Sequence, residues 1–353
     1  MKILVIKFRN IGDILLSTPL LANLRHYFPE ANIDYATNDE CIPIIEDNPL
    51  VDNLISFERK KNKKLSFLDK VLQEIKILKM IRTNSYDVVL NLTEGDRGAL
   101  YTLFSGAKNK FSIKPSNYLI SNIGMFTSVI ENNFNIHTVE KDLQFIPLLN
   151  KEIVYKKLSI SWPSQAEQGL FKILPEEKAQ DYVVIHPVSR WMFKCWNNEE
   201  MAKVIDYIIL KKNVSVILTG SSAEIEMNRI DEILNLCHSI PIVLGGKLSL
   251  KELSFLISRA KLFFGVDSAP MHIASACDIK VLALFGASSP LCWGPWYDGK
   301  RKFKDIDGIQ FNNFHYIISN MNHEIYYENG IKKTRGMDNI TFQQVKSVLN
   351  KIL

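Results

Sequence analysis

The feature that most constrains this chain is the regular alternation of short β-branched runs with amphipathic segments of helix length. This pattern predicts parallel sheets covered by helices on both faces. The first half supplies predicted strands at Lys2–Ile6, Ile33–Ala36, Asn53–Phe57, Asp87–Leu92 and Lys110–Ile113. The second half supplies predicted strands at Tyr182–His186, Val214–Thr219, Ile242–Leu244, Leu262–Gly265 and Val281–Phe285. We therefore predict an α/β fold made of two doubly wound units.

The helix-length segments and the chain length predict where these units lie. The predicted helices are Phe67–Thr83, Glu199–Lys211, Glu224–Leu236, Leu250–Arg259, Ala269–Cys277 and Thr341–Leu353. A chain of 353 residues suits two domains, each with its own core. A polar stretch with two prolines marks the connection. We place the first domain at 1–165, a linker at 166–180, the second domain at 181–335, and a C-terminal helix at 336–353 that packs back on the first domain.

Composition excludes several classes of protein. No uncharged apolar run approaches the roughly 18 residues that cross a bilayer, so we do not expect an integral membrane protein. The apolar start of the chain is interrupted by Lys7, Arg9 and Asp13 and lacks a cleavage site, which favours the cytosol. Five cysteines without paired spacing predict reduced thiols, without disulfides or structural zinc. A net charge of +5 is too mild for a nucleic-acid footprint, but it suits an anionic small molecule or membrane surface.

The first motif is the turn Ile11-Gly12-Asp13 between a buried strand and a helix. Doubly wound folds bind ligands at the carboxyl edge of the sheet, which is where this turn is predicted to place Asp13. The alternative is that Asp13 only caps the helix. Pro19 predicts either a kink or a new helix that begins after Ser17 or Thr18.

The second motif is a basic and aromatic loop, Ser189 to Trp196, that follows the strand ending in His186-Pro187. Lys194 in this loop lies just before a predicted helix. An ammonium group beside free N–H groups at a helix N-terminus suits a diphosphate. The alternative is a solvated surface lysine, which is the usual location of this residue type.

The third motif is Gly265-Val266-Asp267-Ser268, which joins a buried strand to a helix of small residues containing His272. Its helix N-terminus is again predicted at the carboxyl edge of the sheet, where an anion can bind. The alternative is that Asp267 or Ser268 only caps the helix and that His272 is a partly buried histidine. The neighbouring strand repeats the pattern with Gly286 and Ser288.

Together and in this order, the motifs resemble glycosyltransferase family 9, the ADP-heptose:lipopolysaccharide heptosyltransferases, over essentially the whole chain. The residues that carry the resemblance are Ile11-Gly12-Asp13 with Pro19, Leu20, Leu24, Arg25 and Pro29; His186-Pro187 with Lys194 and Trp196; Gly265 to Ser268 with His272; and Leu284-Phe285-Gly286 with Pro290 and Gly294-Pro295. The stretch Arg190 to Trp196 is most similar to the heptosyltransferase III branch, which adds the side-branch heptose to the second inner-core heptose.

The resemblance implies a fold and a reaction. It implies a GT-B enzyme with two Rossmann-like domains facing a central cleft, and an inverting direct displacement without metal or other cofactor. Asp13 matches the proposed general base, and Lys194 matches the lysine that contacts the donor phosphates. The other implied donor contacts are Ser189, Glu224 (with Glu226 as a competitor), Asp267, Ser268, Ala269 and His272. The family commonly has Asp-Thr-Gly in this motif, whereas in this chain Asp267 is followed by Ser268-Ala269-Pro270, so one glycine for close phosphate approach is lost.

The implied partners are ADP-heptose, bound mainly by the second domain, and the lipopolysaccharide inner core at the inner leaflet, bound mainly by the first. We expect Gly12, Arg9 and Arg97 at the acceptor, with Lys7, Arg59 and Lys60 as further basic groups for its phosphates. Segments near Arg59–Leu68 and Phe111–Phe126 mix aromatic, apolar and basic residues, which suits peripheral membrane contact or ordinary loops. We expect a monomer and no nucleic-acid partner.

Other functions share parts of this pattern. The nearest is heptosyltransferase II, which adds the second main-chain heptose and has the same motifs. A GT-B nucleotide-sugar epimerase requires several acids and histidines that converge on one cleft, and here only Asp13, Asp267 and His272 are candidates. A non-catalytic nucleotide-sugar-binding protein would keep Lys194 and Asp267 but lose Asp13. All three residues are present, which favours an active transferase.

Overall fold

The computed structural model describes residues 1–58, 66–121, 124, 126–176, 180–297, 303–306, 308–312, 314–328 and 330–353. The chain divides into two compact units, Met1–Ser161 and Trp162–Leu353. Each unit has its own sheet and its own buried core, as the alternating sequence pattern predicts. The division falls after Ser161, whereas the first domain was predicted to extend to residue 165.

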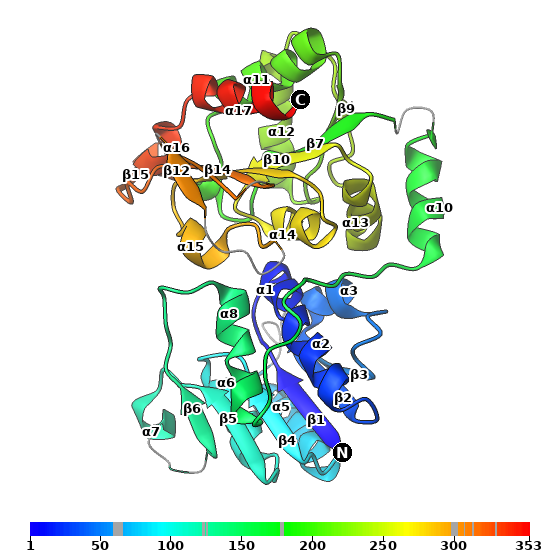
Figure 1. Cartoon of the computed structure of the whole chain (residues 1–353), viewed down its shortest axis with the longest axis vertical. Helices are drawn as coiled ribbons and strands as arrows, with labels where there is room; N and C mark the ends of the chain where they lie inside the picture. The colour runs from blue at the N-terminus through cyan, green and yellow to red at the C-terminus, as the bar shows by residue number, and fades with distance from the viewer. Residues whose placement is uncertain are drawn as a thin grey trace. The chain divides into compact units, whose positions relative to one another are not determined.

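The first unit is built on a parallel sheet in the order β3-β2-β1-β4-β5-β6 (Figure 1). Its strands are β1 Lys2–Ile6, β2 Asn32–Asn38, β3 Asn53–Phe57, β4 Val88–Asn91, β5 Asn109–Ile113 and β6 Ser128–Ile130. The first five confirm the predicted strands, with small shifts at their ends. This is the Rossmann order, in which the strand order reverses beside β1 and leaves a ligand-binding position at the carboxyl ends of the strands there.

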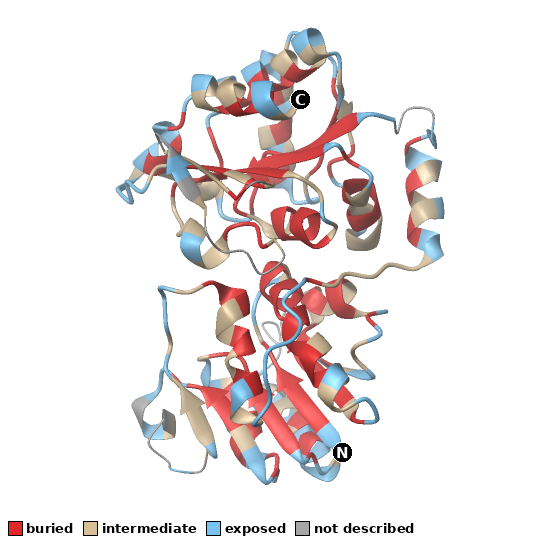
Figure 2. Ribbon diagram, in the orientation of Figure 1, coloured by how far each residue is buried: buried red, intermediate tan, exposed pale blue. Residues whose placement is uncertain are grey.

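Helices cover the sheet of the first unit because their apolar sides need burial. Their bounds are α1 Ile11–Leu16, α2 Thr18–Tyr27, α3 Ile42–Ile45, α5 Phe67–Thr83, α6 Asp96–Phe104, α7 Tyr118–Ser121, α8 Thr138–Leu143 and α9 Phe145–Leu148, with a 3₁₀ turn at Asp39–Cys41. Pro19 begins a new helix and does not kink an existing one, since α1 ends before Ser17 and α2 begins at Thr18. Figure 2 shows the strands and the inward sides of the helices as the buried part of the unit.

The second unit repeats the architecture. Its strands are β7 Tyr182–His186, β8 Ser215–Leu218, β9 Ile242–Val243, β10 Leu262–Val266, β11 Val281–Phe285, β12 Lys304–Ile306, β13 Ile309–Phe311 and β14 Tyr316–Ser319. They form one sheet in the order β12-β13-β14-β11-β10-β7-β8-β9, with β12 and β13 antiparallel at one edge. The parallel part again has the Rossmann order, counted from β7 as its first strand. The two doubly wound units of the prediction are therefore confirmed.

The helices of the second unit include one in the segment that was predicted to be a linker. They are α10 Ser164–Ile173, α11 Asn198–Lys212, α12 Glu224–Leu236, α13 Leu250–Ser258, α14 Ala269–Ala276, α15 Pro290–Trp293, α16 Arg335–Asp338 and α17 Phe342–Ile352, with a 3₁₀ turn η3 at Met192–Lys194. The predicted linker 166–180 is largely wrong, because α10 packs on α13 with Trp162 and Phe171 against the ring of Phe255. None of the helices in the described ranges is long and apolar enough to cross a membrane.

The C-terminal helix packs in the core of the second unit, whereas the prediction assigned it to the first. Val345, Val348 and Leu349 of α17 are fully buried in the core of the second unit, where α17 contacts α11 and β14. The amphipathic pattern showed that this helix needs an apolar partner, but both units offer one. A hairpin of β15 Ile325–Glu328 and β16 Ile331–Thr334 precedes it and contacts η3.

Candidate active site

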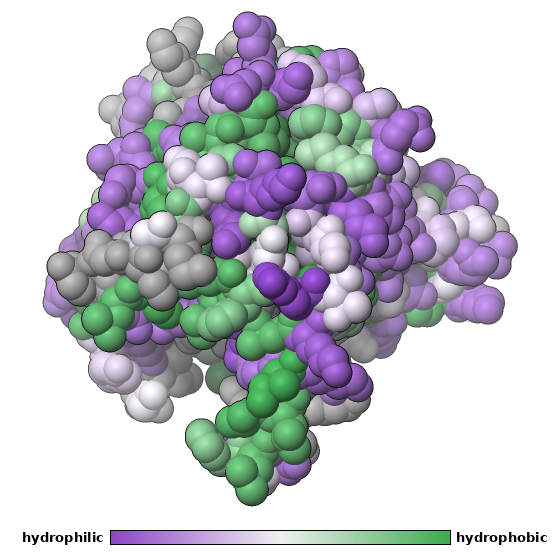
Figure 3. Space-filling view, turned by 90° about the horizontal axis from the view of Figure 1, so that it is seen from below, coloured by the Kyte–Doolittle hydropathy of each residue, from purple (hydrophilic) through white to green (hydrophobic). Residues whose placement is uncertain are grey.

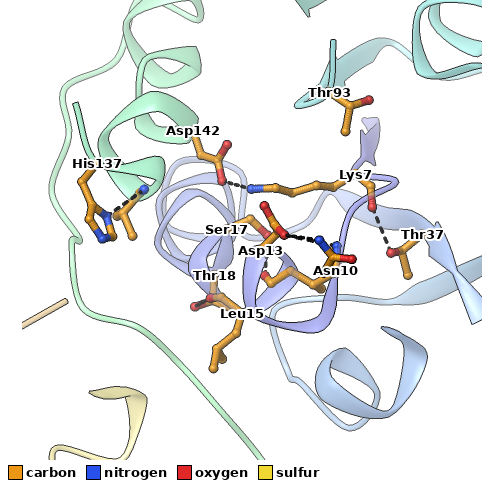
Figure 4. A network of polar contacts seen from close by, with 12 residues as sticks. Lys7, Asn10, Asp13, Leu15, Ser17, Thr18, Thr37, Thr93, His137 and Asp142 are labelled. Carbon is orange, nitrogen blue, oxygen red and sulfur yellow. Dashed lines mark hydrogen bonds and ion pairs between the residues drawn. The ribbon is translucent and has the colours of Figure 1, made fainter. Parts of the chain in front are cut away.

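The first unit gathers polar side chains where β1 ends (Figure 4). Asp13 is the third residue of α1, and only 7% of its surface is exposed. Its Oδ2 accepts hydrogen bonds from the Asn10 backbone N–H at 3.2 Å and from the Asn10 side-chain amide at 3.4 Å. Asp13 therefore does cap the helix, which was the alternative reading of the motif. Both bonds fall on Oδ2, so the capping role fixes the carboxylate without occupying Oδ1.

A buried ion pair lies beside Asp13 (Figure 4). Lys7 follows β1, and its Nζ donates a short hydrogen bond to Oδ2 of Asp142 on α8; each side chain is 2% exposed. Burial raises the pKa of Asp142 to about 6; the Lys7 ammonium opposes this rise, and the nearby charge of Asp13 adds to it. Since Lys7 offsets the charge of Asp142, Asp13 faces a neutral pair and not a second bare carboxylate.

This pair corrects one prediction and adds a residue that sequence reasoning missed. The prediction that Lys7 meets the charged acceptor is wrong, because Lys7 is buried and bound to Asp142. Asp142 was not predicted at all. The signal was present, since Val139, Leu143 and Ile146 form a buried face with helical spacing and Asp142 occupies a position on that face. A carboxylate at such a position requires a partner.

The helix that carries Asp142 is held firmly at its start. His137 is the N-cap of α8: its Nδ1 accepts from the Val139 N–H at 3.2 Å, and Glu140 accepts from the His137 N–H at 3.2 Å. On the opposite side, Thr37 donates to the backbone carbonyl of Lys7 at 2.9 Å. The segments on both sides of the ion pair are therefore anchored independently of it.

The predicted acceptor residues lie in the first unit but are engaged in other contacts. Arg9 pairs with Glu94 at 3.2 Å. Arg97 pairs with Glu74 at 2.9 Å, and its guanidinium lies 3.7 Å from the ring centroid of Phe57. Both arginines keep exposed surface. Gly12 is buried in α1, next to Asp13. The basic residues Arg59 and Lys60 lie outside the described residues.

The second unit brings the Lys194 loop to the Asp267 turn. Lys194 Nζ lies 2.5 Å from Asp267 Oδ2, and the Ser288 hydroxyl donates to the same oxygen at 2.5 Å. Three motifs that are far apart in the sequence thus meet at the carboxyl ends of β7, β10 and β11. The lysine is 21% exposed and the aspartate 8%, so a ligand can reach this pair. The interpretation of Lys194 as a freely solvated lysine is wrong.

Four of the remaining predicted donor residues lie in α14, at its N-cap position, or in the loop that carries Lys194. Ser268 is the N-cap position of α14, but its hydroxyl donates to the Val266 carbonyl at 3.2 Å. Ala269 begins the helix, and His272 is buried within it. Ser189 is buried, and its hydroxyl accepts from the Trp191 N–H at 3.3 Å. Each of these residues except His272 borders the loop or turn that carries Lys194 or Asp267.

Glu224 and Glu226 differ in the structure. Glu224 begins α12 and is exposed, whereas Glu226 is buried and accepts from the Ser221 N–H at 2.8 Å. Glu226 therefore shapes the turn after β8, and Glu224 is the carboxylate that solvent or a ligand can reach. The ribose role assigned to Glu224 stays a prediction.

Several motif residues serve the fold of the second unit. Trp196 is buried and donates from its indole nitrogen to the Ile340 carbonyl at 2.9 Å. A Cβ at Gly286 would lie 2.3 Å from the backbone nitrogen of Met337, so only glycine allows this approach. The hairpin supports η3, since the Thr334 hydroxyl donates to the Phe193 carbonyl at 3.1 Å. These contacts fix the loop that presents Lys194.

These arrangements define what each unit can do chemically. The first unit holds a nearly buried, oriented carboxylate that can accept a proton. The second holds a lysine at a sheet edge beside the N-terminus of α14, which suits a phosphate. Within the described ranges, no three His, Cys, Asp or Glu side chains cluster as metal ligands.

The family model for glycosyltransferase family 9 (heptosyltransferase) matches residues 75–312. Lipopolysaccharide heptosyltransferase 3 of Escherichia coli K12 is 34% identical over 297 residues, which are 83% of this chain and 84% of that protein. Lipopolysaccharide heptosyltransferase 2 of the same strain is 23% identical and spans 100% of this chain and 99% of that protein.

A solved structure shows the same fold. The E. coli heptosyltransferase WaaC with ADP has a TM-score of 0.74 and 17% sequence identity, and the match covers all of both chains. The GT-B fold predicted from the motifs is confirmed by this likeness and by the two Rossmann-like units. The family match, the 34% identity and the fold agree: this chain belongs to glycosyltransferase family 9, the heptosyltransferases, and is a glycosyltransferase.

Proposed function

We propose that this glycosyltransferase moves a heptose from ADP-heptose to the second heptose of the lipopolysaccharide inner core, where it forms the side branch. The observation that carries this choice of acceptor is the 34% identity to the E. coli protein named heptosyltransferase 3, against 23% for the one named heptosyltransferase 2. Motifs shared by the whole family do not separate these acceptors, but overall similarity does favour one of them.

In the proposed reaction, Asp13 is the general base. Its carboxylate takes the proton of the attacking acceptor hydroxyl, the hydroxyl oxygen bonds to the anomeric carbon of the donor, and the bond from that carbon to the ADP oxygen breaks. A sugar hydroxyl is a weak nucleophile at neutral pH, so a positioned carboxylate contributes on the order of 10²- to 10⁴-fold to the rate. The Asn10 hydrogen bonds support this role because they are both accepted by Oδ2 and so hold the carboxylate in one orientation. Oδ1 is then the oxygen that would take the proton.

On the donor side, Lys194 would bind the diphosphate and offset the charge that develops on the departing ADP. Asp267, oriented by Ser288, would accept hydrogen bonds from the heptose hydroxyls, and the first amides of α14 at Ser268 and Ala269 would meet a phosphate. Lys194 and Asp267 contact each other in this structure. ADP-heptose would insert between them or share the lysine, which has three N–H donors.

The place of the reaction follows from its substrates. We propose that the enzyme works in the cytosol, as a monomer in contact with the inner leaflet that holds its acceptor. The separate core of each unit supports a monomer, because neither sheet needs a second chain to bury it.

The test is transfer from ADP-heptose, followed by mass spectrometry, to lipopolysaccharide cores truncated after one or after two heptoses. We expect one heptose to be added to the two-heptose core only, with the anomeric configuration inverted relative to the donor by NMR. Addition to the one-heptose core would instead assign the enzyme to the main-chain step. Tight ADP-heptose binding without transfer to either core would contradict the proposal and favour a binding protein.

A further inference from the structure

Helix α5 of the first unit has two apolar faces, although a helix at the surface of a unit needs only one. Its inner face buries Ile77 and Ile81, and on the same side Glu74 bonds to Arg97 and Tyr101. Its outer face carries five large apolar side chains that are exposed: Phe67 77%, Leu68 73%, Val71 39%, Leu72 63% and Ile75 53%. The outer face therefore exposes apolar area that the described part of the unit does not bury.

The five exposed side chains form one continuous stripe. At about 100° per residue they fall within an arc of about 140° on the first two and a half turns of α5. Lys79 and Arg82 continue the same arc into the last turns and are also exposed. The stripe is thus apolar at the start of the helix and basic at its end. Figure 3 shows that apolar side chains gather in a protruding patch on one face of the molecule.

Basic residues outnumber acidic ones in the sequence of this helix and of the segment before it. Residues 59–82 hold nine Lys or Arg and two Asp or Glu, a net charge of +7, while the whole chain has +5. The rest of the chain therefore sums to −2. One of the two acids, Glu74, points to the inner face, where it pairs with Arg97. The exposed basic residues of α5 itself are Lys76, Lys79 and Arg82, against one exposed acid, Asp69. An occupant that is both apolar and negatively charged therefore fits the outer face best.

We propose that the outer face of α5 docks on the surface of a bilayer that contains anionic lipid, with Phe67, Leu68 and Leu72 among the acyl chains and the basic residues among the headgroups. A helix with an apolar stripe and basic residues beside it binds the membrane interface in two ways: its apolar side chains are buried among the acyl chains, and its basic side chains are attracted to anionic headgroups. A second copy of this chain is the weaker occupant, because it would bring the exposed basic residues of two α5 helices together. This inference rests on the proposed function only in that a lipid-linked acceptor places the enzyme at a membrane.

The test uses the full chain and flotation with vesicles of either pure phosphatidylcholine or phosphatidylethanolamine with a quarter phosphatidylglycerol. We expect the wild type to float with the anionic vesicles and to be released from them at 0.5 M NaCl. The double variant Leu68→Asn/Leu72→Asn should bind them at least tenfold more weakly. A matched control, Leu210→Asn/Ile240→Asn, removes two exposed apolar side chains from the second unit and should bind like the wild type.

Two further readouts separate this inference from the proposed function. With a water-soluble core oligosaccharide as acceptor, the Leu68/Leu72 variant should keep wild-type turnover, since neither residue belongs to the site; with acceptor embedded in vesicles it should slow. Vesicle binding that depends on α5 would support the docking surface even if no acceptor is ever heptosylated.

Three results would overturn the docking surface. The first is equal vesicle binding by wild type and the Leu68/Leu72 variant. The second is the absence of vesicle binding by an active enzyme. The third is a wild-type dimer, measured by light scattering, that becomes a monomer in the variant.

Discussion

The two units share a strand order, and each places a lysine–aspartate pair near the carboxyl edge of its own sheet. The two pairs differ in how far their side chains are exposed to solvent. Lys7 and Asp142 of the first unit are each 2% exposed, whereas Lys194 and Asp267 of the second are 21% and 8% exposed. A fully buried pair cannot exchange its partner for a ligand without unfolding around it. The comparison teaches that the first pair holds its segments together, whereas the second pair keeps a charged group in contact with solvent, as the proposed donor site requires.

The largest expected effect is the loss of one partner of the buried pair. Lys7→Met leaves the Asp142 carboxylate buried without its cation, which should lower the free energy of unfolding by about 3–5 kcal/mol at pH 7.5. At pH 5 Asp142 should be protonated, because burial already raises its pKa to about 6, so the loss should be smaller there. Urea unfolding at both pH values measures this.

The control for this prediction is Lys7→Met combined with Asp142→Leu, which removes both charges. The double variant should recover most of the lost stability, since the two side chains become apolar together. A single variant as stable as the wild type at pH 7.5 would show that the pair is not as buried as the structure has it.

Acid should act on the second unit through His186. Burial lowers the pKa of His186 to about 4, below the ordinary value of 6.5. The unfolded chain then binds more protons than the folded one between pH 6.5 and pH 4, so this histidine makes the unit less stable as pH falls through that window. The full loss is about 3 kcal/mol. In thermal unfolding, His186→Gln should show a shallower decline over that window than the wild type; an identical slope would contradict the prediction.

The partly exposed pair of the second unit, Lys194 and Asp267, should affect donor affinity more than stability. In the proposed donor site Lys194 makes a charge-assisted contact to the diphosphate, worth about 1.5–3 kcal/mol, so Lys194→Met should weaken ADP-heptose binding by about 10- to 100-fold. Lys203→Met is the matched control, because Lys203 pairs with Glu200 on the exposed face of α11. Isothermal titration calorimetry compares the two variants. Equal affinities would place the donor phosphates elsewhere.

The smallest effect is expected at Ser288. Its hydroxyl donates to Asp267 at 2.5 Å, so Ser288→Ala removes one of the groups that orient this carboxylate. A hydrogen bond to a charged group contributes about 1.5–3 kcal/mol, but Asp267 keeps its contact with Lys194, so we expect only a few-fold loss of ADP-heptose affinity. Affinity for ADP itself should stay unchanged, because the proposed role of Asp267 concerns the sugar. A parallel loss for both ligands would show that Asp267 does not read the heptose.

Most of the fold was predictable because it follows from local patterns. The β-branched runs and amphipathic segments place strands such as Lys2–Ile6 and Tyr182–His186 at their observed bounds, and the early proline marks the start of α2. The meeting of Lys194 with Asp267 follows from the same logic, since both residues come after strands whose carboxyl ends share one edge. The hydrophobic period of the sequence and the order of strands in a doubly wound sheet are enough to predict both the elements and this meeting of side chains.

The rest depends on which surfaces meet across the chain, and local patterns do not contain that information. The buried face of α17 suits the core of either unit, so its packing was predicted wrongly. Lys7 and Asp142 are 135 positions apart, and the basic residue was taken for a surface group because nothing nearby shows that it is buried. The roles of the donor and acceptor residues stay predictions, because the structure gives their positions and not their ligands.

The central claim is that the first unit supplies the base and the second unit holds the donor, and Asp13→Asn tests it most directly. Turnover with a two-heptose core and the dissociation constant of ADP-heptose should be measured on the same preparation. We predict that turnover falls on the order of 10²- to 10⁴-fold while the dissociation constant stays within twofold of the wild type. Normal turnover, or a loss of donor binding that accounts for the slower reaction, would contradict the account.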